Sequence, residues 1–251
     1  MSNLDRNFAT ARTGYRSDQV AIDAGLRAYM IRVYNYMTAG VALTGLVAWF
    51  TYSAAVVDIG AGLQLTQFGH AIFASPLMWL FLLAPLGLVM LLSFGINRLS
   101  AGTALTVFFV YAALLGLSLA SIFLVYTHAS ITRVFFISAA TFGATSLYGY
   151  TTQRDLTSVG SFMFMGLIGL IIASVVNIFL HSTGLDWAIS VIGVIVFVGL
   201  TAYDTQRIKE SYDVNDDGTI SGRKAVMGAL RLYLDFINLF LMLLRILGDR
   251  R

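Results

Sequence analysis

Long apolar runs separated by short polar stretches follow one another along most of the chain. Six of these runs contain no Lys, Arg, Asp or Glu, and they cover residues 33–52, 76–96, 103–125, 134–150, 160–180 and 187–203. Each is close to the ~20 residues that a helix needs to cross the hydrocarbon core of a bilayer. The runs are apolar on every face, whereas the strands of a membrane barrel alternate between apolar and polar positions. The pattern predicts six transmembrane helices.

A seventh apolar run, residues 225–247, is interrupted by charged side chains. Arg231, Asp235 and Arg245 lie within it. The connections between runs are short, and no Pro- or Ser-rich linker divides the chain. We therefore expect an all-α polytopic membrane protein, with one domain over residues 33–251. Residues 1–32 are polar and lack the early apolar core of a signal peptide, so they are predicted to be a mature tail.

The amino-acid composition also indicates a membrane protein. Hydrophobic residues make up 58% of the chain and charged residues only 12%, against about 25% in a typical soluble domain. This balance excludes a disordered chain, an ordinary soluble enzyme and a nucleic-acid-binding protein, although the pI is about 9.2. The absence of Cys excludes disulfides and thiolate metal sites, and three His are few for an imidazole site. The sequence predicts no cofactor and no resident metal.

The distribution of Lys and Arg predicts the orientation. The polar tail carries five Arg, and the loop after the sixth run carries Arg207, Lys209, Arg223 and Lys224. The loops expected on the opposite side carry only Arg133. Because positive charge favours the cytoplasmic side, the N-terminus is expected to be cytoplasmic. The basic C-terminal end leaves two alternatives open, since a seventh full span exports it and a re-entrant helix retains it.

Three ionisable residues stand out because intramembrane charges are costly. Asp204 directly follows the sixth run, Asp235 lies inside the seventh, and Arg98 follows the second. With this topology all three fall in the cytoplasmic half, and Asp235 lies about 15 Å from the start of its helix. Two carboxylates that approach in low dielectric share a proton, and their oxygens attract hard cations. The alternative is a static Asp–Arg pair that only holds helices together.

The seventh run carries a polar stripe. Residues at spacings of four, three, four and three fall on one helical face, and they are Arg231, Asp235, Asn238, Met242 and Arg245. We expect this face to point into the bundle. The alternative is an interfacial helix with snorkelling arginines, which a short, deep Asp235 fits poorly.

Two motifs give the chain a resemblance to a known family. Tyr203-Asp204-Thr205-Gln206 and Leu232-Tyr233-Leu234-Asp235-Phe236-Ile237-Asn238-Leu239-Phe240 are similar to motifs of the Bax inhibitor-1 (transmembrane Bax-inhibitor-motif) family. The order of a polar tail, six spans and a polar last helix is also similar. Without long extra domains the chain resembles bacterial members, which implies the bacterial inner (plasma) membrane.

The resemblance implies a fold and a mechanism. The fold is a seven-helix bundle with the polar last helix at its centre. The implied activity is a pH-sensitive leak of Ca²⁺ across the membrane, with Asp204 and Asp235 as a hydrogen-bonded pH sensor. An arginine at the end of the second helix acts as a latch on the pair, and here that residue is Arg98.

A further stretch, residues 213–220, matches the first positions of an EF-hand loop. Asp213, Asn215 and Asp217 would supply oxygen ligands, with Gly218 at the sharp turn. The final ligand position holds Lys224 instead of Glu, which favours a polar turn over a Ca²⁺ site. His70, His128 and His181 lie near the ends of runs, as interfacial residues do.

Three functions compete at this point. The favoured one is a Ca²⁺ leak gated by H⁺ at the aspartate pair. The second is a non-transporting regulator that binds another membrane protein, such as a protease or a cell-death factor. The third is an intramembrane aspartyl hydrolase, for which the usual Gly-x-Gly-Asp signature is absent around Asp235. The protein is therefore expected not to be an enzyme, and its expected partners are the bilayer, Ca²⁺ and H⁺.

Overall fold

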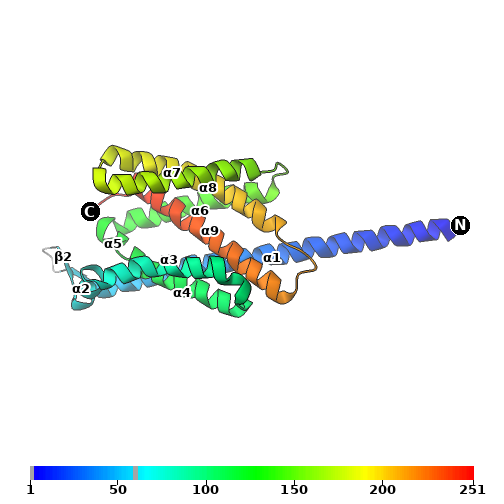
Figure 1. Cartoon of the computed structure of the whole chain (residues 1–251), viewed down its shortest axis with the longest axis horizontal. Coiled ribbons are helices and arrows are strands. Elements are labelled where there is room, and N and C mark those ends of the chain that lie inside the picture. Colours follow the sequence, from blue (N-terminus) through cyan, green and yellow to red (C-terminus); the bar gives the residue numbers. More distant parts are fainter. Residues whose placement is uncertain (1–2, 59–61) are drawn as a thin grey trace.

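The structure is a computed structural model that describes the backbone of residues 3–58 and 62–251 and the side chains of residues 24–57 and 62–251. Its long helices run roughly side by side (Figure 1). They are α1 (Asn3–Ala55), α3 (Leu77–Gly95), α4 (Ala101–Leu119), α6 (His128–Thr151), α7 (Thr157–Leu180), α8 (Thr183–Glu210) and α9 (Gly218–Leu247). The expected all-α fold is confirmed. The tail arginines Arg6, Arg12 and Arg16 have side chains outside the described residues.

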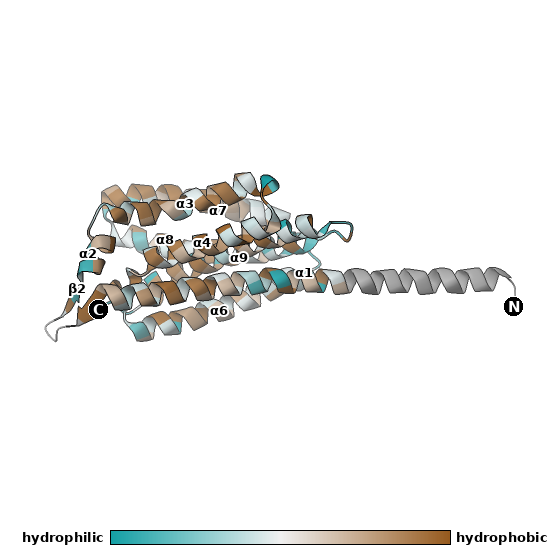
Figure 2. Cartoon of the chain, turned by 90° about the horizontal axis from the view of Figure 1, so that it is seen from below, coloured by the Kyte–Doolittle hydropathy of each residue, from teal (hydrophilic) through white to brown (hydrophobic). Residues whose placement is uncertain are grey.

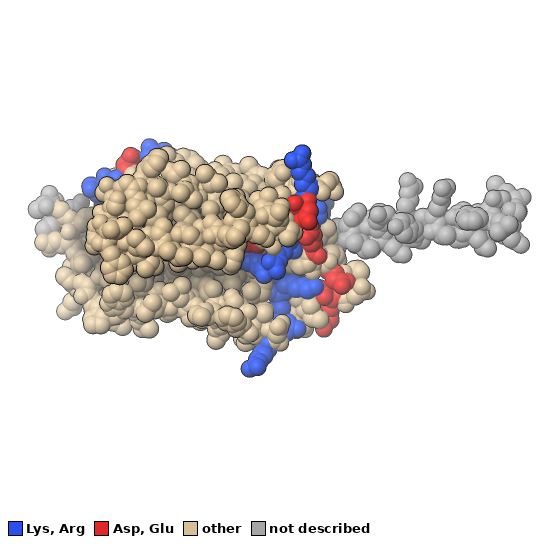
Figure 3. Space-filling model, turned by 45° about the horizontal axis from the view of Figure 1, so that its top comes forward, with Lys and Arg blue, Asp and Glu red and all other residues tan. Residues whose placement is uncertain are grey.

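The surface of the bundle is that of a membrane protein. Five of the described helical segments are long and apolar enough to cross a membrane: Ala24–Ala55, Leu77–Arg98, Ala101–Val125, Thr157–Leu180 and Thr183–Glu210. Hydrophobic residues make up much of the helices of the bundle (Figure 2), and many large ones are exposed, such as Phe94, Phe162 and Phe179. On the face in Figure 3, charged side chains gather toward the two ends, and a broad uncharged belt separates them. This belt is what a bilayer requires of the surface that it surrounds.

The helices α6 and α9 correspond to the fourth and seventh expected runs and are more polar than those five. In α6 the hydroxyl groups donate to carbonyls one turn earlier, as Ser138 does to Val134 and Thr141 to Ile137. Such internal hydrogen bonds satisfy polar side chains within an apolar environment. Part of the reduced hydropathy of α6 therefore comes from hydroxyl groups, such as those of Ser138 and Thr141, whose hydrogen bonds stay inside the helix.

The last helix, α9, packs against α1, α4, α6 and α8. Fifteen of its residues are buried, among them Tyr233, Leu239 and Leu244. It is one continuous helix of 30 residues, which corresponds to about 45 Å and exceeds the ~30 Å hydrocarbon core. Its start lies near the end of α8, and the C-terminus reaches the other end of the bundle (Figure 1). Within the described residues this segment is therefore one continuous helix along the bundle, without the turn of a hairpin.

Two local features differ from the sequence-based reading. The segment after α1 contains a small antiparallel hairpin of β1 (Val56–Asp58) and β2 (Leu63–Leu65), followed by α2 (Gln67–Phe73). Gly62 has a φ of 133°, a conformation that residues with a Cβ rarely adopt. The third expected run, residues 103–125, is broken into α4 and α5 (Ile122–Val125), and the second continues into the short 3-10 helix η1 (Ile96–Arg98).

Close approach of α6 and α8 depends on Gly149. A Cβ added at Gly149 would collide with the backbone carbonyl of Ala202. We expect Gly149→Ala to lower the free energy of unfolding by about 1–3 kcal/mol, the usual effect of overpacking. In Gly143→Ala on the same helix the added Cβ meets open space. That control is expected to be neutral or stabilising by up to about 1 kcal/mol. Thermal denaturation of the purified variants in detergent measures the difference, and equal loss in both would contradict the packing argument.

Candidate functional site: a polar seam between α8 and α9

The four residues of the α8 motif point toward different parts of the bundle. The ring of Tyr203 packs where Gly160 of α7 has no side chain. Asp204 faces α9, and the Thr205 hydroxyl lies 2.9 Å from Ser146 Oγ of α6. Gln206 reaches the connection between α6 and α7. One turn of α8 therefore ties together three neighbouring helices and a loop, which fixes the direction of the Asp204 side chain.

Gln206 holds the α6–α7 connection by two hydrogen bonds. Its Nε2 donates to the carbonyl of Arg154 at 2.9 Å, and its Oε1 accepts from the amide of Leu156 at 2.8 Å. We expect Gln206→Ala to lower the free energy of unfolding by about 2 kcal/mol because these groups lose their partners. Gln153→Ala in the same connection, where the side chain is exposed, is the matched control. Thermal denaturation distinguishes them, and a loss as large in Gln153→Ala would refute this role for Gln206.

The expected carboxylates lie near one cation at the end of the bundle where α9 begins. Asp204 Oδ1 is 3.9 Å from Arg231 Nη1, and the Asp204 side chain is only 17% exposed. Asp235 is one turn after Arg231 on α9 and is 5% exposed. Asp204 and Arg231 are the charged groups that act on Asp235, whereas Arg231 and Arg207 act on Asp204. Both motif aspartates therefore lie at low exposure in the part of the bundle where α8 meets α9.

Asp235 has a buried oxygen without a partner. Its Oδ2 accepts no hydrogen bond from any residue that the structure describes. A buried, unpartnered carboxylate oxygen carries a desolvation penalty of about 1–3 kcal/mol or more. Such a group is stabilised by a proton, a cation or water, so this position is poised to take up one of them.

The α9 stripe continues along α8 beyond the aspartates. Asn238 Nδ2 donates to the carbonyl of Leu234 at 2.8 Å, so its amide lies along its own helix. The Met242 side chain fills the space at Gly193, where any Cβ would collide with its Cγ and Sδ. Arg245 Nη1 then lies 3.3 Å from Asp186 Oδ1 of α8. We call this line of contacts, from Asp204–Arg231 to Asp186–Arg245, the polar seam.

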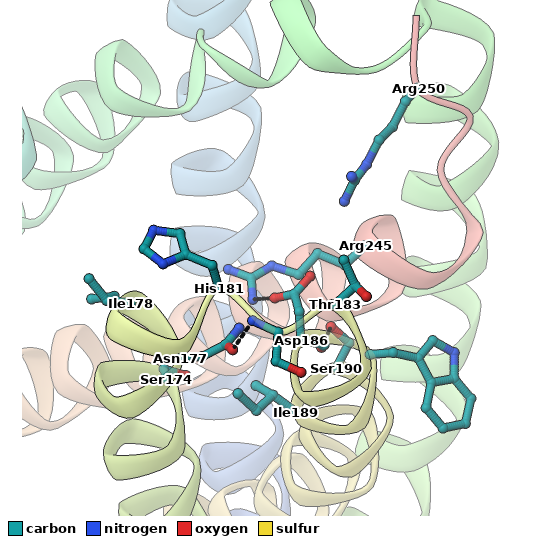
Figure 4. A pocket seen from close by; sticks show the side chains of 12 residues that line it. Ser174, Asn177, Ile178, His181, Thr183, Asp186, Ile189, Ser190, Arg245 and Arg250 are labelled. Atoms are coloured by element: carbon teal, nitrogen blue, oxygen red, sulfur yellow. Dashed lines mark hydrogen bonds and ion pairs between the residues drawn. The ribbon is translucent and has the colours of Figure 1, made fainter.

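The far end of the polar seam opens into a cavity of about 670 Å³. Ser174 and Asn177 of α7, the first turns of α8, and Arg245 and Arg250 line it. In Figure 4 the Arg245 side chain reaches Asp186 at this cavity, and Arg250 points toward it from the C-terminal segment. Asp186 and Asp204 are 18 residues apart on α8, or about 27 Å. The polar seam is therefore almost as long as the hydrocarbon core is thick.

Arg98 lies at the end of the second expected helix, as the family resemblance implies, but among the described side chains it does not contact the aspartates as an ion-pair partner. It ends η1 and is exposed. Arg231 is the cation at Asp204 in this structure. The sequence did place Arg231 four residues before Asp235, on the same helical face, but it gave no sign of which arginine reaches Asp204.

The stretch that resembles an EF-hand forms a turn and a helix cap. Asp217 Oδ1 accepts from the amide of Ile220 at the start of α9, and Lys224 pairs with Asp216. Asp213 Oδ1 accepts from the backbone and side chain of Asn215, and these hydrogen bonds hold the pKa of Asp213 below its usual value. Within the described residues no three His, Asp or Glu side chains gather in a way that holds a metal ion.

Comparison with known proteins agrees with these motifs. The family model described as "Inhibitor of apoptosis-promoting Bax1" matches residues 26–251. The chain is 51% identical over 241 residues to "Inner membrane protein YbhL" of Escherichia coli K12, covering 94% of this chain and 98% of that protein. It is 47% identical over 235 residues to protein RP147 of Rickettsia prowazekii, covering 94% and 95%. A Caulobacter vibrioides protein is 42% identical over 253 residues, covering 100% of both chains. Since the family model spans nearly the whole described bundle, the chain is an integral membrane protein of the Bax inhibitor family.

Proposed function

We propose that this protein is a pH-sensitive cation leak of the bacterial inner membrane, with Ca²⁺ as its transported ion and a cytoplasmic N-terminus. The observation that carries the proposal is the buried Asp235, whose Oδ2 has no hydrogen-bond partner among the described residues. It lies beside a second carboxylate, Asp204, and a cation, Arg231. An intramembrane cluster of this kind marks ion pathways and proton relays in membrane proteins.

The charges of the cluster suggest how pH acts. When Asp204 is ionised, it attracts Arg231 across the start of the polar seam. Protonation removes the negative charge and with it the attraction, so α8 and α9 lose one of the contacts that hold this end together. Acidification therefore favours the separated state of the helices. The two aspartates are expected to titrate as a coupled pair.

The carboxylate oxygens of Asp204 and Asp235 are also suitable ligands for Ca²⁺. Ca²⁺ prefers carboxylate, carbonyl and water oxygens, and the polar seam offers Asp204, Asp235 and the amide oxygen of Asn238. A leak needs weak and temporary ligands, so a site that lacks a closed ligand cage agrees with passage better than with storage. At the far end the cavity at Asp186 and Arg245 gives the polar seam an opening.

The direct test is Ca²⁺ flux into proteoliposomes that hold the purified protein, measured between pH 5 and pH 8. We expect flux above that of empty liposomes, rising as the pH falls by an amount on the order of ten-fold, within the range of typical coupling energies. Flux no higher than in empty liposomes at every pH would refute the leak. That result would favour the second hypothesis, a regulator that binds another membrane protein.

A further inference from the structure

A groove on the outer face of the bundle lies between α1 and α6, with α9 as its floor. Its volume is about 430 Å³. Trp49 and Phe136 stand at its rim and are 46% and 66% exposed, whereas Phe236 and Phe240 of α9 are buried at its base. Nearly all of the lining is apolar. Because the rim residues lie on membrane-spanning helices, this groove faces the hydrocarbon of the bilayer.

The length of the groove matches one leaflet. Along α1 it extends from Val41 to Trp49, eight residues or about 12 Å. Half of the hydrocarbon core is about 15 Å thick. The groove therefore begins near the membrane surface at the C-terminal end of α9 and stops near the bilayer centre, as one acyl chain does.

The surface end of the groove carries a cation. The rings of Trp49, Tyr52, Phe123 and His128 form an aromatic cluster there, with centroids 5.3–6.5 Å apart. Arg251 Nη1 donates to Tyr52 Oη at 3.3 Å, and its Nη2 lies 3.3 Å from His128 Nδ1. Neighbouring Asp249 pairs with Arg133 instead. Among the described side chains Arg251 has no carboxylate partner, so most of its five N–H donors remain available.

We infer that this groove binds one acyl chain of an anionic phospholipid, whose phosphate is held by Arg251. Guanidinium and phosphate form strong, bidentate hydrogen bonds, and basic positions between transmembrane helices bind lipid head groups. The acyl chain of the lipid lies against Phe236, the residue after Asp235. The lipid therefore contacts α9 next to the aspartate cluster. This inference does not depend on the proposed leak.

Two glycines on different helices allow a matched test of whether the acyl chain of the lipid lies in the groove. Gly45 lines the groove on α1, and a Cβ added there meets no atom within 4 Å. Gly87 on α3 is equally open and exposed but lies outside the groove. Gly45→Leu fills the groove, and Gly87→Leu makes the same change elsewhere. Both variants are expected to fold, because at each position the added Cβ has no atom within 4 Å and the residue is exposed.

The experiment uses vesicles that contain a phospholipid with a photoactivatable diazirine in its acyl chain. Phosphatidylglycerol and phosphatidylcholine with identical chains are compared, and the labelled peptides are mapped by mass spectrometry. We expect label on the groove-lining parts of α1, α6 and α9, about five-fold stronger for phosphatidylglycerol, the ratio given by ~1 kcal/mol for one cation. Arg251→Gln should make the two lipids equal. Gly45→Leu should remove the label, and Gly87→Leu should keep it.

Three results would overturn the inference. Groove labelling that persists in Gly45→Leu means that the acyl chain does not occupy the groove at Gly45. Equal labelling by both lipids in the unmodified protein means that Arg251 binds no phosphate. An unlabelled groove in a protein that migrates as a dimer, and as a monomer after Gly45→Leu, means that a second copy fills it.

Discussion

Asp235→Asn is expected to abolish the pH dependence of Ca²⁺ flux while leaving the protein folded and inserted. Asn has nearly the shape of Asp but carries no charge and does not titrate between pH 5 and pH 8. Asp235 is 5% exposed and has an unpartnered oxygen, so protonation of its carboxylate removes a buried charge next to Asp204 and Arg231. The ratio of flux at pH 5 to flux at pH 8, on the order of ten in the unmodified protein, should fall to about one.

Asp249→Asn is the matched control for this prediction. Asp249 also pairs with an arginine, Arg133 at 3.0 Å, but both side chains are more than half exposed at the end of the bundle. Surface pairs of this kind contribute little. The control should therefore keep the full pH response. A retained response in Asp235→Asn, or an equal loss in Asp249→Asn, would show that the sensor lies elsewhere.

Arg231→Gln is expected to raise flux at neutral pH toward the level that the unmodified protein reaches in acid. Arg231 is the cation within 3.9 Å of Asp204, and without it the polar seam loses the attraction that protonation would otherwise remove. With one of the two positive charges near Asp204 removed, the carboxylates hold their protons more readily, so the midpoint of the remaining pH response should move to higher pH. Proteoliposome flux measured over the same pH series reports both effects.

Arg98→Gln is the informative comparison, because the family resemblance assigns the latch to Arg98. In this structure Arg98 is exposed at the end of η1 and has no ion pair with Asp204 or Asp235 among the described side chains. We expect its removal to change neutral-pH flux much less than Arg231→Gln does. A larger rise in Arg98→Gln would return the latch to Arg98 and leave Arg231 as a structural partner of Asp204.

The length of the apolar runs was sufficient to predict the transmembrane helices but not the short elements between and within them. Runs of ~20 apolar residues leave no other membrane-compatible structure than a helix, since every backbone group must find a partner within the segment. The hairpin of Val56–Asp58 and Leu63–Leu65 was missed because strands of three residues carry too little pattern. The break between α4 and α5 was missed because Ala120 and Ser121 resemble the residues around them.

The candidate site was predictable to the level of a helical face. The spacing of Arg231, Asp235, Asn238, Met242 and Arg245 placed them on one stripe, and the structure turns Arg231, Met242 and Arg245 of that stripe toward α8. The identity of the cation at Asp204 was not predictable, because Arg98, Arg207 and Arg231 all lie in the half of the bundle where α8 ends and α9 begins. Which of them reaches the carboxylate depends on the packing of α9 against α8, and local sequence does not encode that distance.

Water access to the polar seam tests the central claim, that loss of the charge on Asp204 opens the contact between α8 and α9. The chain has no Cys, so Met242→Cys, opposite Gly193, introduces a single thiol. Its rate of modification by a water-soluble thiol reagent is measured at one neutral pH, with and without Asp204→Asn, so that the titration of the thiol does not enter. Ala112→Cys, buried in α4 away from the polar seam, is the control.

We expect Asp204→Asn to accelerate modification at position 242 by about ten-fold, the ratio for a shift of ~1.4 kcal/mol in the opening equilibrium, and to leave position 112 unmodified. An unchanged rate at position 242, or an equal acceleration at position 112, would contradict the opening of this seam.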